Sequence, residues 1–220
     1  MQSAVVVFPG SNCDRDLVQA ISAQSASACK MLWHKDTTLP RGLDILFIPG
    51  GFSFGDYLRC GAIAANSPIM ESIIDFAHKG GFIIGICNGF QVLTEAALLK
   101  GTLLRNAGVN FICRQQSLIV TSNDSIMTKN FSKGEKLKLP IAHHDGNFFA
   151  DEATINVLEQ NEQVLFRYDN NPNGSKNDIA GIMSENHRII GLMPHPERAT
   201  DENLGSKDGT RIFQSLVESF

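Results

Sequence analysis

Short apolar runs alternate with amphipathic stretches through the first half of the chain. Four short, mainly apolar runs end at glycine, proline or polar positions, as strands do, and they cover residues 3–8, 29–33, 44–48 and 82–86. Apolar residues recur at helical spacing over residues 68–78 and 90–99, and in an earlier helix whose inner face is Leu17, Val18, Ile21 and Ala28. Strands that alternate with helices predict a parallel sheet covered by helices on both faces.

The start of the first helix carries capping signals. Ser11 and Asn12 precede it, and either side chain can accept a hydrogen bond from a free N–H of the first turn. Asp14 and Asp16 add negative charge where the helix dipole favours it. We therefore expect Ser11 or Asn12 to cap this helix.

The second half of the chain is richer in strand patterns. Paired strands are predicted over residues 109–114 and 117–121, and further strands over 141–143, 164–168, 179–183 and 189–193. The Asn-rich segment 170–177 is typical of an exposed loop tip. A helix over 208–220 follows, with an inner face of Ile212, Phe213, Leu216 and Val217. We expect one α/β domain over residues 1–220, with an open, mostly parallel sheet and helices on both faces.

Composition narrows the class of protein. The 220 residues carry 19 Lys+Arg and 23 Asp+Glu, a net charge of −4, and no basic run that would bind nucleic acid or an anionic membrane. No apolar run approaches the about 20 residues of a membrane span, and the first residues lack the basic segment of a signal peptide. Five cysteines without framework spacing indicate reduced thiols. We expect a cytoplasmic protein.

A cysteine between two glycines follows the strand predicted at 82–86. The segment Gly85-Ile86-Cys87-Asn88-Gly89 is the thiol counterpart of the Gly-x-Ser-x-Gly nucleophile elbow. Glycines are needed because a strand that turns directly into a helix brings its backbone too close to its neighbours for side chains. The helix N-terminus favours a thiolate. We expect Cys87 to be a nucleophile, and the other cysteines to be buried apolar thiols: Cys13, Cys29, Cys60 and Cys113.

A histidine and a glutamate stand at the end of the strand predicted at 189–193. In Pro194-His195-Pro196-Glu197, the proline after His195 favours an extended backbone, so that residues 195 and 197 point to the same side. Glu197 can then accept a hydrogen bond from one ring nitrogen while the other faces a thiol. A lone His-x-Glu is weak evidence, but together with an elbow cysteine it predicts a catalytic triad.

A glycine turn ends the strand predicted at 44–48. Gly50 and Gly51 leave their backbone N–H groups unobstructed, so the turn can donate to a developing oxyanion. The N–H of Asn88, directly after the nucleophile, is the natural second donor. Taken alone, Gly50-Gly51 would be an ordinary turn. With the thiol and the His-x-Glu pair, it indicates acyl transfer through a thioester.

These motifs carry a resemblance to a known family. The chain resembles the class I (triad) glutamine amidotransferases over nearly its whole length, through the elbow at 85–91 and the Pro-His-Pro-Glu-Arg segment at 194–198. The segments FPGSNCD (8–14) and PGGFSFGDYLR (49–59) are similar to one branch of the family, the glutaminase subunits of a synthetase of purine biosynthesis. The resemblance implies a flavodoxin-like fold.

The resemblance also implies roles for single residues. Cys87 would attack the side-chain carboxamide of glutamine, His195 would act as base and then acid, and Glu197 would orient it. Gly51 and Asn88 would supply oxyanion N–H groups, and Gln91 and Gly50 would bind glutamine. The products would be ammonia and glutamate.

One segment departs from the family pattern. Family members usually have Ala-His-Gly-Glu-Gly where this chain has Ala142-His143-His144-Asp145-Gly146, so the carboxylate is one methylene shorter. The detail of the wall near glutamine is therefore open, whereas the triad is intact. His143, His144 and Asp145 could also suggest a metal site, but no further ligands stand at a zinc-like spacing, and we expect no metal.

The chemistry requires a partner chain. Using the ammonia on a formylglycinamide nucleotide needs ATP, and the sequence has no Gly-x-x-x-x-Gly-Lys-Ser/Thr loop. The resemblance implies a large synthetase subunit, which would hold ATP and Mg²⁺, and a small bridging subunit; this chain would carry no cofactor. We hypothesise that docking strengthens the glutaminase because the partner orders the oxyanion turn.

Two other classes of function remain open at this stage. A cysteine hydrolase or hydratase of a related parallel-sheet type is one, although such proteins commonly place histidine directly after the nucleophile, where this chain has Asn88. A non-catalytic regulatory or scaffold subunit is the other, and the complete triad argues against it.

Overall fold

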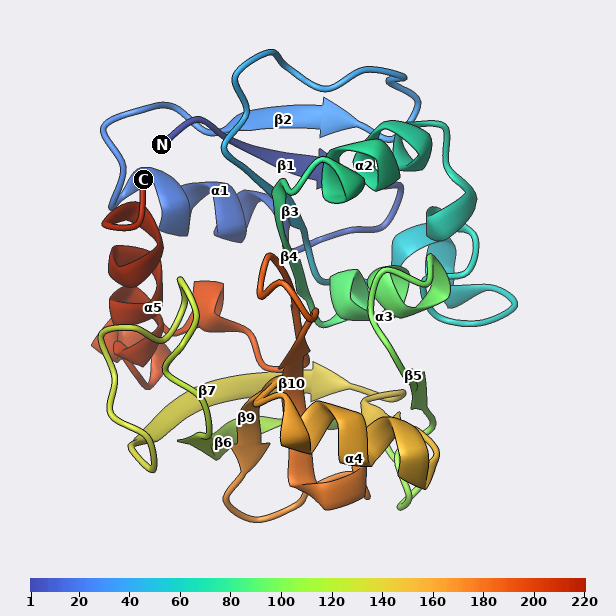
Figure 1. The fold of residues 1–220 in the computed structure, drawn as a ribbon, viewed down its shortest axis with the longest axis vertical. Coiled ribbons are helices and arrows are strands. Elements are labelled where there is room, and N and C mark those ends of the chain that lie inside the picture. Colours follow the sequence, from blue (N-terminus) through green and yellow to red (C-terminus); the bar gives the residue numbers. More distant parts are fainter.

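The computed structural model describes all 220 residues as one α/β arrangement around a nine-stranded sheet (Figure 1). The helices are α1 (Asp14–Ser22), α2 (Ile69–His78), α3 (Asn88–Glu95), α4 (Glu152–Gln160) and α5 (Asp208–Val217). The sheet has the order β2 (Lys30–Trp33), β1 (Ser3–Val7), β3 (Ile45–Ile48), β4 (Phe82–Ile86), β11 (Ile189–Leu192), β10 (Ile179–Met183), β9 (Val164–Tyr168), β6 (Ile112–Val120) and β7 (Lys136–His143). A separate antiparallel pair joins β5 (Thr102–Leu104) to β8 (Asn147–Phe149).

Five neighbouring strands, from β2 to β11, form the parallel half of the sheet. Their order of two, one, three, four and then the last strand is that of a flavodoxin-like fold, which confirms the expected fold class. In such sheets ligands bind beyond the carboxyl ends of the strands. Here the carboxyl ends of β3, β4 and β11 lead directly into Pro49, Cys87 and Met193.

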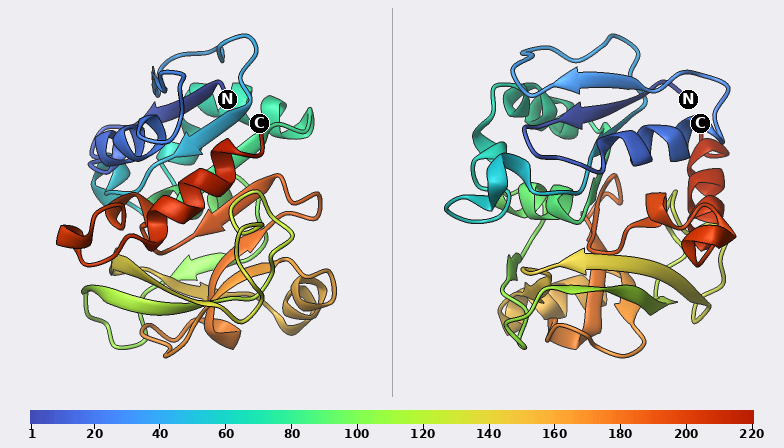
Figure 2. Two further views of the ribbon diagram at one scale, coloured as in Figure 1. Left: turned by 90° about the vertical axis from the view of Figure 1, so that its left-hand side faces the viewer. Right: turned by 180° about the vertical axis from the view of Figure 1, so that it is seen from behind.

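The remaining four strands are antiparallel and curl back toward the parallel half. Strands β10, β9, β6 and β7 follow β11 in the sheet order, and β6 pairs with β7 along eight residues. Although β7 is the far edge strand, its Pro140 carbonyl accepts a hydrogen bond of 2.8 Å from the N–H of His195, just after β11. The curl therefore brings the end of β7 to the carboxyl edge of the parallel strands (Figure 2).

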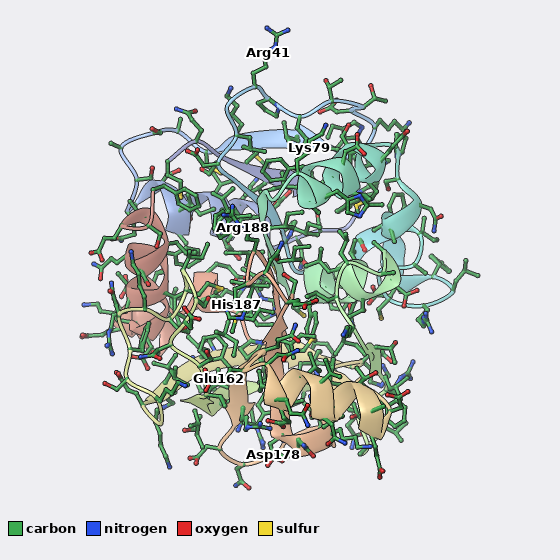
Figure 3. All side chains as sticks on the ribbon, viewed as in Figure 1. Arg41, Lys79, Glu162, Asp178, His187 and Arg188 are labelled. Atoms are coloured by element: carbon green, nitrogen blue, oxygen red, sulfur yellow. The ribbon has the colours of Figure 1, made fainter.

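Helices cover the parallel half from two sides: α1 and α5 lie on one side, and α2 and α3 on the other (Figure 1). One apolar cluster contains 53 buried residues. Charged side chains such as Arg41, Lys79 and Asp178 stand at the periphery of the molecule (Figure 3). None of the helices combines the length and apolar character that a membrane span requires.

Most predicted strands and helices of the first half are confirmed, but the predicted cap of α1 is wrong. The helix begins after Cys13, whose side chain makes no capping bond. The Ser11 hydroxyl instead bonds the backbone of Phe8, accepting from its N–H at 2.9 Å and donating to its carbonyl at 2.8 Å. Ala28 lies beyond the end of the helix, and Ala20 takes its place on the buried face.

The second half differs more from its prediction. The two strands expected at 109–114 and 117–121 are one strand, β6, because the polar Gln116 in its middle is buried and donates to the Asn170 carbonyl at 2.9 Å. Strand β7 begins five residues before its predicted start, with Leu137 and Leu139 inside and lysines outside. Helix α4 was not predicted, although Asp151 caps it by accepting from Thr154 N–H at 2.7 Å.

The Asn-rich segment 170–177 is not simply an exposed tip. Asn173 and Ser175 within it are 1% and 3% exposed. The Asn173 amide donates to the Gly146 carbonyl at 2.7 Å, and the Ser175 hydroxyl donates to the same oxygen at 3.3 Å. The segment therefore holds the loop that follows β7, and polar composition alone concealed this role.

Candidate active site

Cys87 stands at a strained turn between β4 and α3, as the elbow motif predicts. Its φ of 51° and ψ of −105° lie outside the regions that side chains favour. A Cβ at Gly89 would come within 2.0 Å of the Ile48 carbonyl oxygen, and one at Gly85 within 2.6 Å of Gly89. Both glycines are thus required, and the thiol is 5% exposed.

His195 and Glu197 form a buried hydrogen-bonded pair. Nδ1 of His195 lies 2.6 Å from Oε1 of Glu197, and the two side chains are 2% and 0% exposed. The predicted hydrogen bond between the two side chains is present, but the backbone at residues 196–198 is a 3₁₀ turn and not the extended chain expected from the prolines. Burial alone would lower the pKa of His195, but the Glu197 carboxylate and the Cys87 sulfur outweigh it and hold that pKa well above its usual range. The opposite ring nitrogen, Nε2, has no protein partner.

The thiol and the imidazole meet at Gly50. A Cβ added to Gly50 would stand 2.7 Å from Cε1 of His195 and 3.3 Å from Cβ of Cys87. The Cys87 sulfur also lies 3.7 Å from the Ala142 carbonyl at the end of β7. The side chains of residues 87 and 195, distant in sequence, are therefore neighbours across a glycine that leaves room for both.

The glycine turn that follows β3 keeps a free N–H. Gly51 has a φ of 123°, and its backbone N–H donates to no other group of the protein. A Cβ there would meet the backbone and side chain of Asn12 at 2.5 Å. Asn88 is the first residue of α3, where an N–H has no acceptor within the helix. Both positions can donate to an oxyanion.

The segment Pro9–Cys13 supports this turn. Phe52 N–H donates to the Gly10 carbonyl at 3.0 Å, Phe54 N–H donates to the Pro9 carbonyl at 2.6 Å, and Cys13 N–H donates to the Gly50 carbonyl at 3.4 Å. No role in the site was expected for this segment from its sequence. Only its glycine, Gly10, signalled a close approach, since a Cβ there would lie 2.4 Å from the Phe52 carbonyl oxygen.

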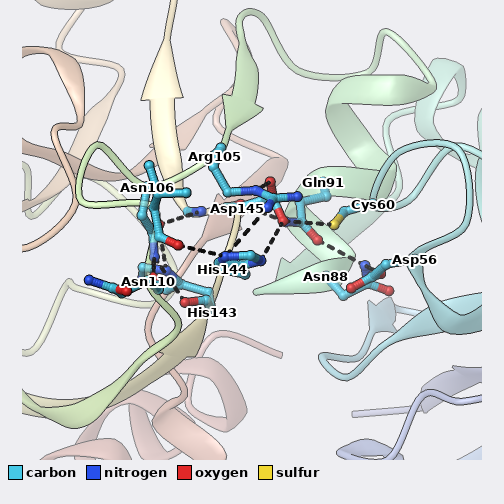
Figure 4. Close-up of polar contacts among 12 residues, drawn as sticks. Asp56, Cys60, Asn88, Gln91, Arg105, Asn106, Asn110, His143, His144 and Asp145 are labelled. Atoms are coloured by element: carbon cyan, nitrogen blue, oxygen red, sulfur yellow. Dashed lines mark hydrogen bonds and ion pairs between the residues drawn. The ribbon is translucent and has the colours of Figure 1, made fainter.

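The wall around Gln91 is a network of polar contacts (Figure 4). Gln91 donates to the Asp145 carbonyl at 2.6 Å and accepts from the Asn88 amide at 2.8 Å. The Asp145 carboxylate accepts from Arg105 at 2.8 Å and from the Cys60 thiol at 3.5 Å. The shorter acid of this chain is therefore tied to two neighbours. Burial raises the pKa of Cys60, and the Asp145 and Asp56 charges add to this effect.

His143 is held as a neutral ring. The Asn106 amide nitrogen donates to the Asn110 and His143 carbonyls, so its oxygen must accept from the Gly146 N–H and from Nδ1 of His143. Burial, followed by the nearby His195, lowers the pKa of His143 to about 4. Asn106 and Asn173 thus fix the loop after β7, and neither was identified from the sequence.

One group of possible metal ligands lies in this site. His143, His144 and Asp145 do not converge on one point; the ligand atoms of Cys13, His195 and Glu197 do, within 4.8 Å of one another. Two ligands of a tetrahedral zinc ion lie about 3.4 Å apart, given bonds of about 2.0–2.1 Å. The 2.6 Å between His195 and Glu197 is instead a hydrogen-bond distance.

The other cysteines differ from the expectation of uniform burial. All five are free thiols. Cys13 is buried, Cys29 and Cys60 are partly exposed, and Cys113 is exposed. Cys113 lines a cavity of about 610 Å³ that reaches His195 and Glu197 from the side of α1.

Cys87 presents its thiol on a strand-to-helix elbow, beside a buried imidazole–carboxylate pair and at the carboxyl edge of a flavodoxin-like sheet. This arrangement defines the class of triad-type cysteine amidotransferases. Residues 1–217 match the model of the CobB/CobQ-like glutamine amidotransferase domain. The chain belongs to this glutamine amidotransferase family.

Several individual proteins are similar to the chain over nearly its whole length. The chain is 58% identical to phosphoribosylformylglycinamidine synthase subunit PurQ from Roseobacter denitrificans over 99% of its length and 97% of the relative's. The PurQ subunit from Trichormus variabilis is 53% identical, with the same coverage. Among solved structures, a chain of PurLQS from Thermotoga maritima superposes with a TM-score of 0.89 at 43% identity, covering 99% and 98%. A putative GMP synthase subunit from Thermoplasma acidophilum, at 14% identity and a TM-score of 0.68, shares the fold.

Proposed function

We propose that this chain is the glutaminase subunit of a phosphoribosylformylglycinamidine synthase. It hydrolyses L-glutamine to glutamate and ammonia, and passes the ammonia to a synthetase that converts formylglycinamide ribonucleotide to formylglycinamidine ribonucleotide in purine biosynthesis. The observation that carries the proposal is the meeting of Cys87 and His195 at Gly50, with Glu197 behind the imidazole, in a chain 58% identical to a PurQ subunit over its full length.

The first half of the reaction forms a thioester. The Cys87 sulfur attacks the carboxamide carbon of glutamine, and His195 holds the thiol proton. The oxygen of the tetrahedral intermediate takes its negative charge between the Gly51 and Asn88 N–H groups. His195 then gives its proton to the nitrogen, the C–N bond breaks, and ammonia leaves.

The second half returns the free thiol. Water attacks the thioester carbon while His195 takes its proton, the C–S bond breaks as His195 returns that proton to the Cys87 sulfur, and glutamate is released. Glu197 keeps the imidazole in one orientation throughout, because its carboxylate accepts from Nδ1 at 2.6 Å. A site that buries both side chains almost fully strengthens these interactions.

Gln91 and Gly50 bind the substrate in this proposal. Gly50 supplies space rather than a contact, since any side chain there would occupy the place where thiol and imidazole meet. Gln91 donates to the Asp145 carbonyl at 2.6 Å. Bound glutamine would replace this contact, and its own polar groups would bond to the residues around Gln91.

A large synthetase subunit and a small bridging subunit would complete the enzyme, with ATP and Mg²⁺ on the synthetase. The name of the PurLQS structure supports an assembly of this kind for its own chains. Directly after the oxyanion glycine, Phe52, Tyr57 and Leu58 are 44%, 74% and 93% exposed. A partner that covers them would press on the turn and strengthen the glutaminase. A reducing cytoplasm suits a reaction that depends on a free thiol.

An affinity label and a coupled assay test the proposal. A glutamine analogue with an electrophilic side-chain ketone should modify Cys87 alone, as peptide mass spectrometry would show, and excess glutamine should protect the thiol. Glutamine hydrolysis should rise when the synthetase and bridging subunits are added. Labelling of Cys113 in preference to Cys87, or no glutamine hydrolysis with all subunits present, would refute the proposal.

A further inference from the structure

We propose that Cys13, which the mechanism above does not use, is a positioning residue for the triad: its thiol donates to the Glu197 oxygen that His195 leaves free. The proposal rests on the proposed function, since it assigns a support to the same site. Cys13 lies in the FPGSNCD segment, directly before α1, and is 2% exposed.

Cys13 lies beside the His195–Glu197 pair and is bonded to the oxyanion turn. Its sulfur lies within 4.8 Å of a His195 ring nitrogen and a Glu197 carboxylate oxygen. Its backbone N–H donates to the carbonyl of Gly50, the residue on which thiol and imidazole meet. One residue therefore links the oxyanion turn to the His195–Glu197 pair.

The Glu197 carboxylate needs a second donor. Oε1 accepts from His195, but Oε2 is buried and no protein group donates to it. A buried acceptor without a partner loses its hydrogen bonds to water and gains none in return, and this loss is larger when the acceptor is charged. Cys13 is the proton-bearing side chain that shares this cluster with the pair.

The thiol is free to take this role. Its contact in the structure is a long one, 3.9 Å to the Asn12 side-chain oxygen, at the far limit for a sulfur donor. Rotation about the Cβ–Sγ bond of Cys13 redirects the S–H without moving the sulfur, and the bond to Gly50 holds the backbone. A single hydrogen bond to Oε2 would then stop the carboxylate from turning and fix the plane of the imidazole.

The proposal predicts an effect on turnover and not on binding. Cys13 is absent from the contacts around Gln91 and Asp145, where glutamine is recognised. If the Glu197 carboxylate could turn, His195 could leave the orientation in which it exchanges a proton with Cys87. Loss of the donor should therefore lower kcat and leave KM nearly unchanged.

Three variants test the proposal in the assembled enzyme. Cys13→Val keeps the volume without a donor, Cys13→Ser restores a donor, and Cys113→Val is the control at an exposed cysteine of the adjacent cavity. We expect Cys13→Val to lower kcat for glutamine hydrolysis about 10- to 100-fold with KM within about two-fold. Cys13→Ser should stay within about three-fold of wild type, and Cys113→Val should match wild type.

The outcomes separate this inference from the proposed function. Wild-type turnover and labelling of Cys87 test the function itself, independently of Cys13. Equal losses in Cys13→Val and Cys13→Ser, or an unchanged kcat in Cys13→Val, would overturn the positioning role. Thermal unfolding of each variant identifies a folding defect, and if Cys13→Val is unstable then Cys13→Ala against Cys13→Ser makes the same comparison.

Discussion

Gly50 packs directly against the ring of His195, so closely that a methyl group at residue 50 would stand 2.7 Å from Cε1. The same methyl group would lie 3.3 Å from Cβ of Cys87. The turn after β3 therefore does more than present an N–H to an oxyanion. It sets the distance between nucleophile and base.

Gly50→Ala should separate the thiol from the imidazole. We expect glutamine hydrolysis to fall at least about 100-fold, since small displacements of reacting groups have effects of this size. Gly108→Ala is the matched control, because a Cβ there meets nothing closer than 4.0 Å. Steady-state turnover of the two variants makes the comparison, and a Gly50→Ala enzyme as active as Gly108→Ala would contradict the geometry.

Glu197→Gln should keep the shape of the pair and remove its charge. Without the carboxylate the imidazolium loses its stabilising partner, and we expect kcat to fall by about 10² to 10⁴. Glu135→Gln breaks a 2.6 Å ion pair with Arg211 at the surface and should leave kcat unchanged. Glutaminase assays of both variants measure this difference in kcat. Similar turnover in the two would argue against an orienting role for Glu197.

Asn173→Ala should destabilise the loop that follows β7, although residue 173 lies outside that loop. The substitution removes a buried donor to the Gly146 carbonyl, so we expect a loss of about 1–3 kcal/mol in the free energy of unfolding. KM for glutamine should rise several-fold, because Gly146 follows the Asp145 carbonyl that Gln91 binds. Asn170→Ala alters an exposed residue of the same segment and serves as the control.

His143 should make stability depend on pH. Its pKa is about 4 in the folded chain, against 6.5 for an ordinary histidine, so between these values the unfolded state binds more protons. Stability should therefore fall as the pH drops from 6.5 toward 4. Between pH 7.5 and pH 5 this contribution is about 2 kcal/mol.

Urea unfolding of His143→Asn at the two pH values measures this contribution. The asparagine can still donate to Asn106 but does not titrate, so the loss of stability at pH 5 should shrink by about 2 kcal/mol relative to wild type. His78→Asn, at an exposed histidine of α2, should behave as wild type. An unchanged pH dependence in His143→Asn would show that His143 is charged within the folded protein.

Elements marked by a short sequence pattern, such as flanking glycines or prolines, were predictable from the sequence. Cys87 between its glycines and His195 between its prolines sit where strand ends and backbone restrictions place them, and the structure brings them together. The parallel half follows from alternating strands and helices, because its strands are short, mainly apolar runs.

What the sequence did not reveal depends on tertiary contacts between polar groups. Gln116 continues β6 because a carbonyl from the 170–177 segment accepts its amide hydrogen. Asn106 and Asn173 are ordinary loop residues until the fold buries them beside Gly146. The support of the oxyanion turn by Pro9–Cys13 is likewise a contact between two strand ends, with no periodic signal in either.

Cys87→Ser in the assembled synthetase tests the central claim most directly, with formylglycinamidine ribonucleotide formation measured from glutamine and from ammonia, and Cys113→Ser as the control. We expect Cys87→Ser to make no product from glutamine and to keep wild-type synthesis from ammonia, whereas Cys113→Ser should use both nitrogen sources. Continued synthesis from glutamine, or loss of synthesis from both nitrogen sources, would contradict a catalytic thiol at residue 87.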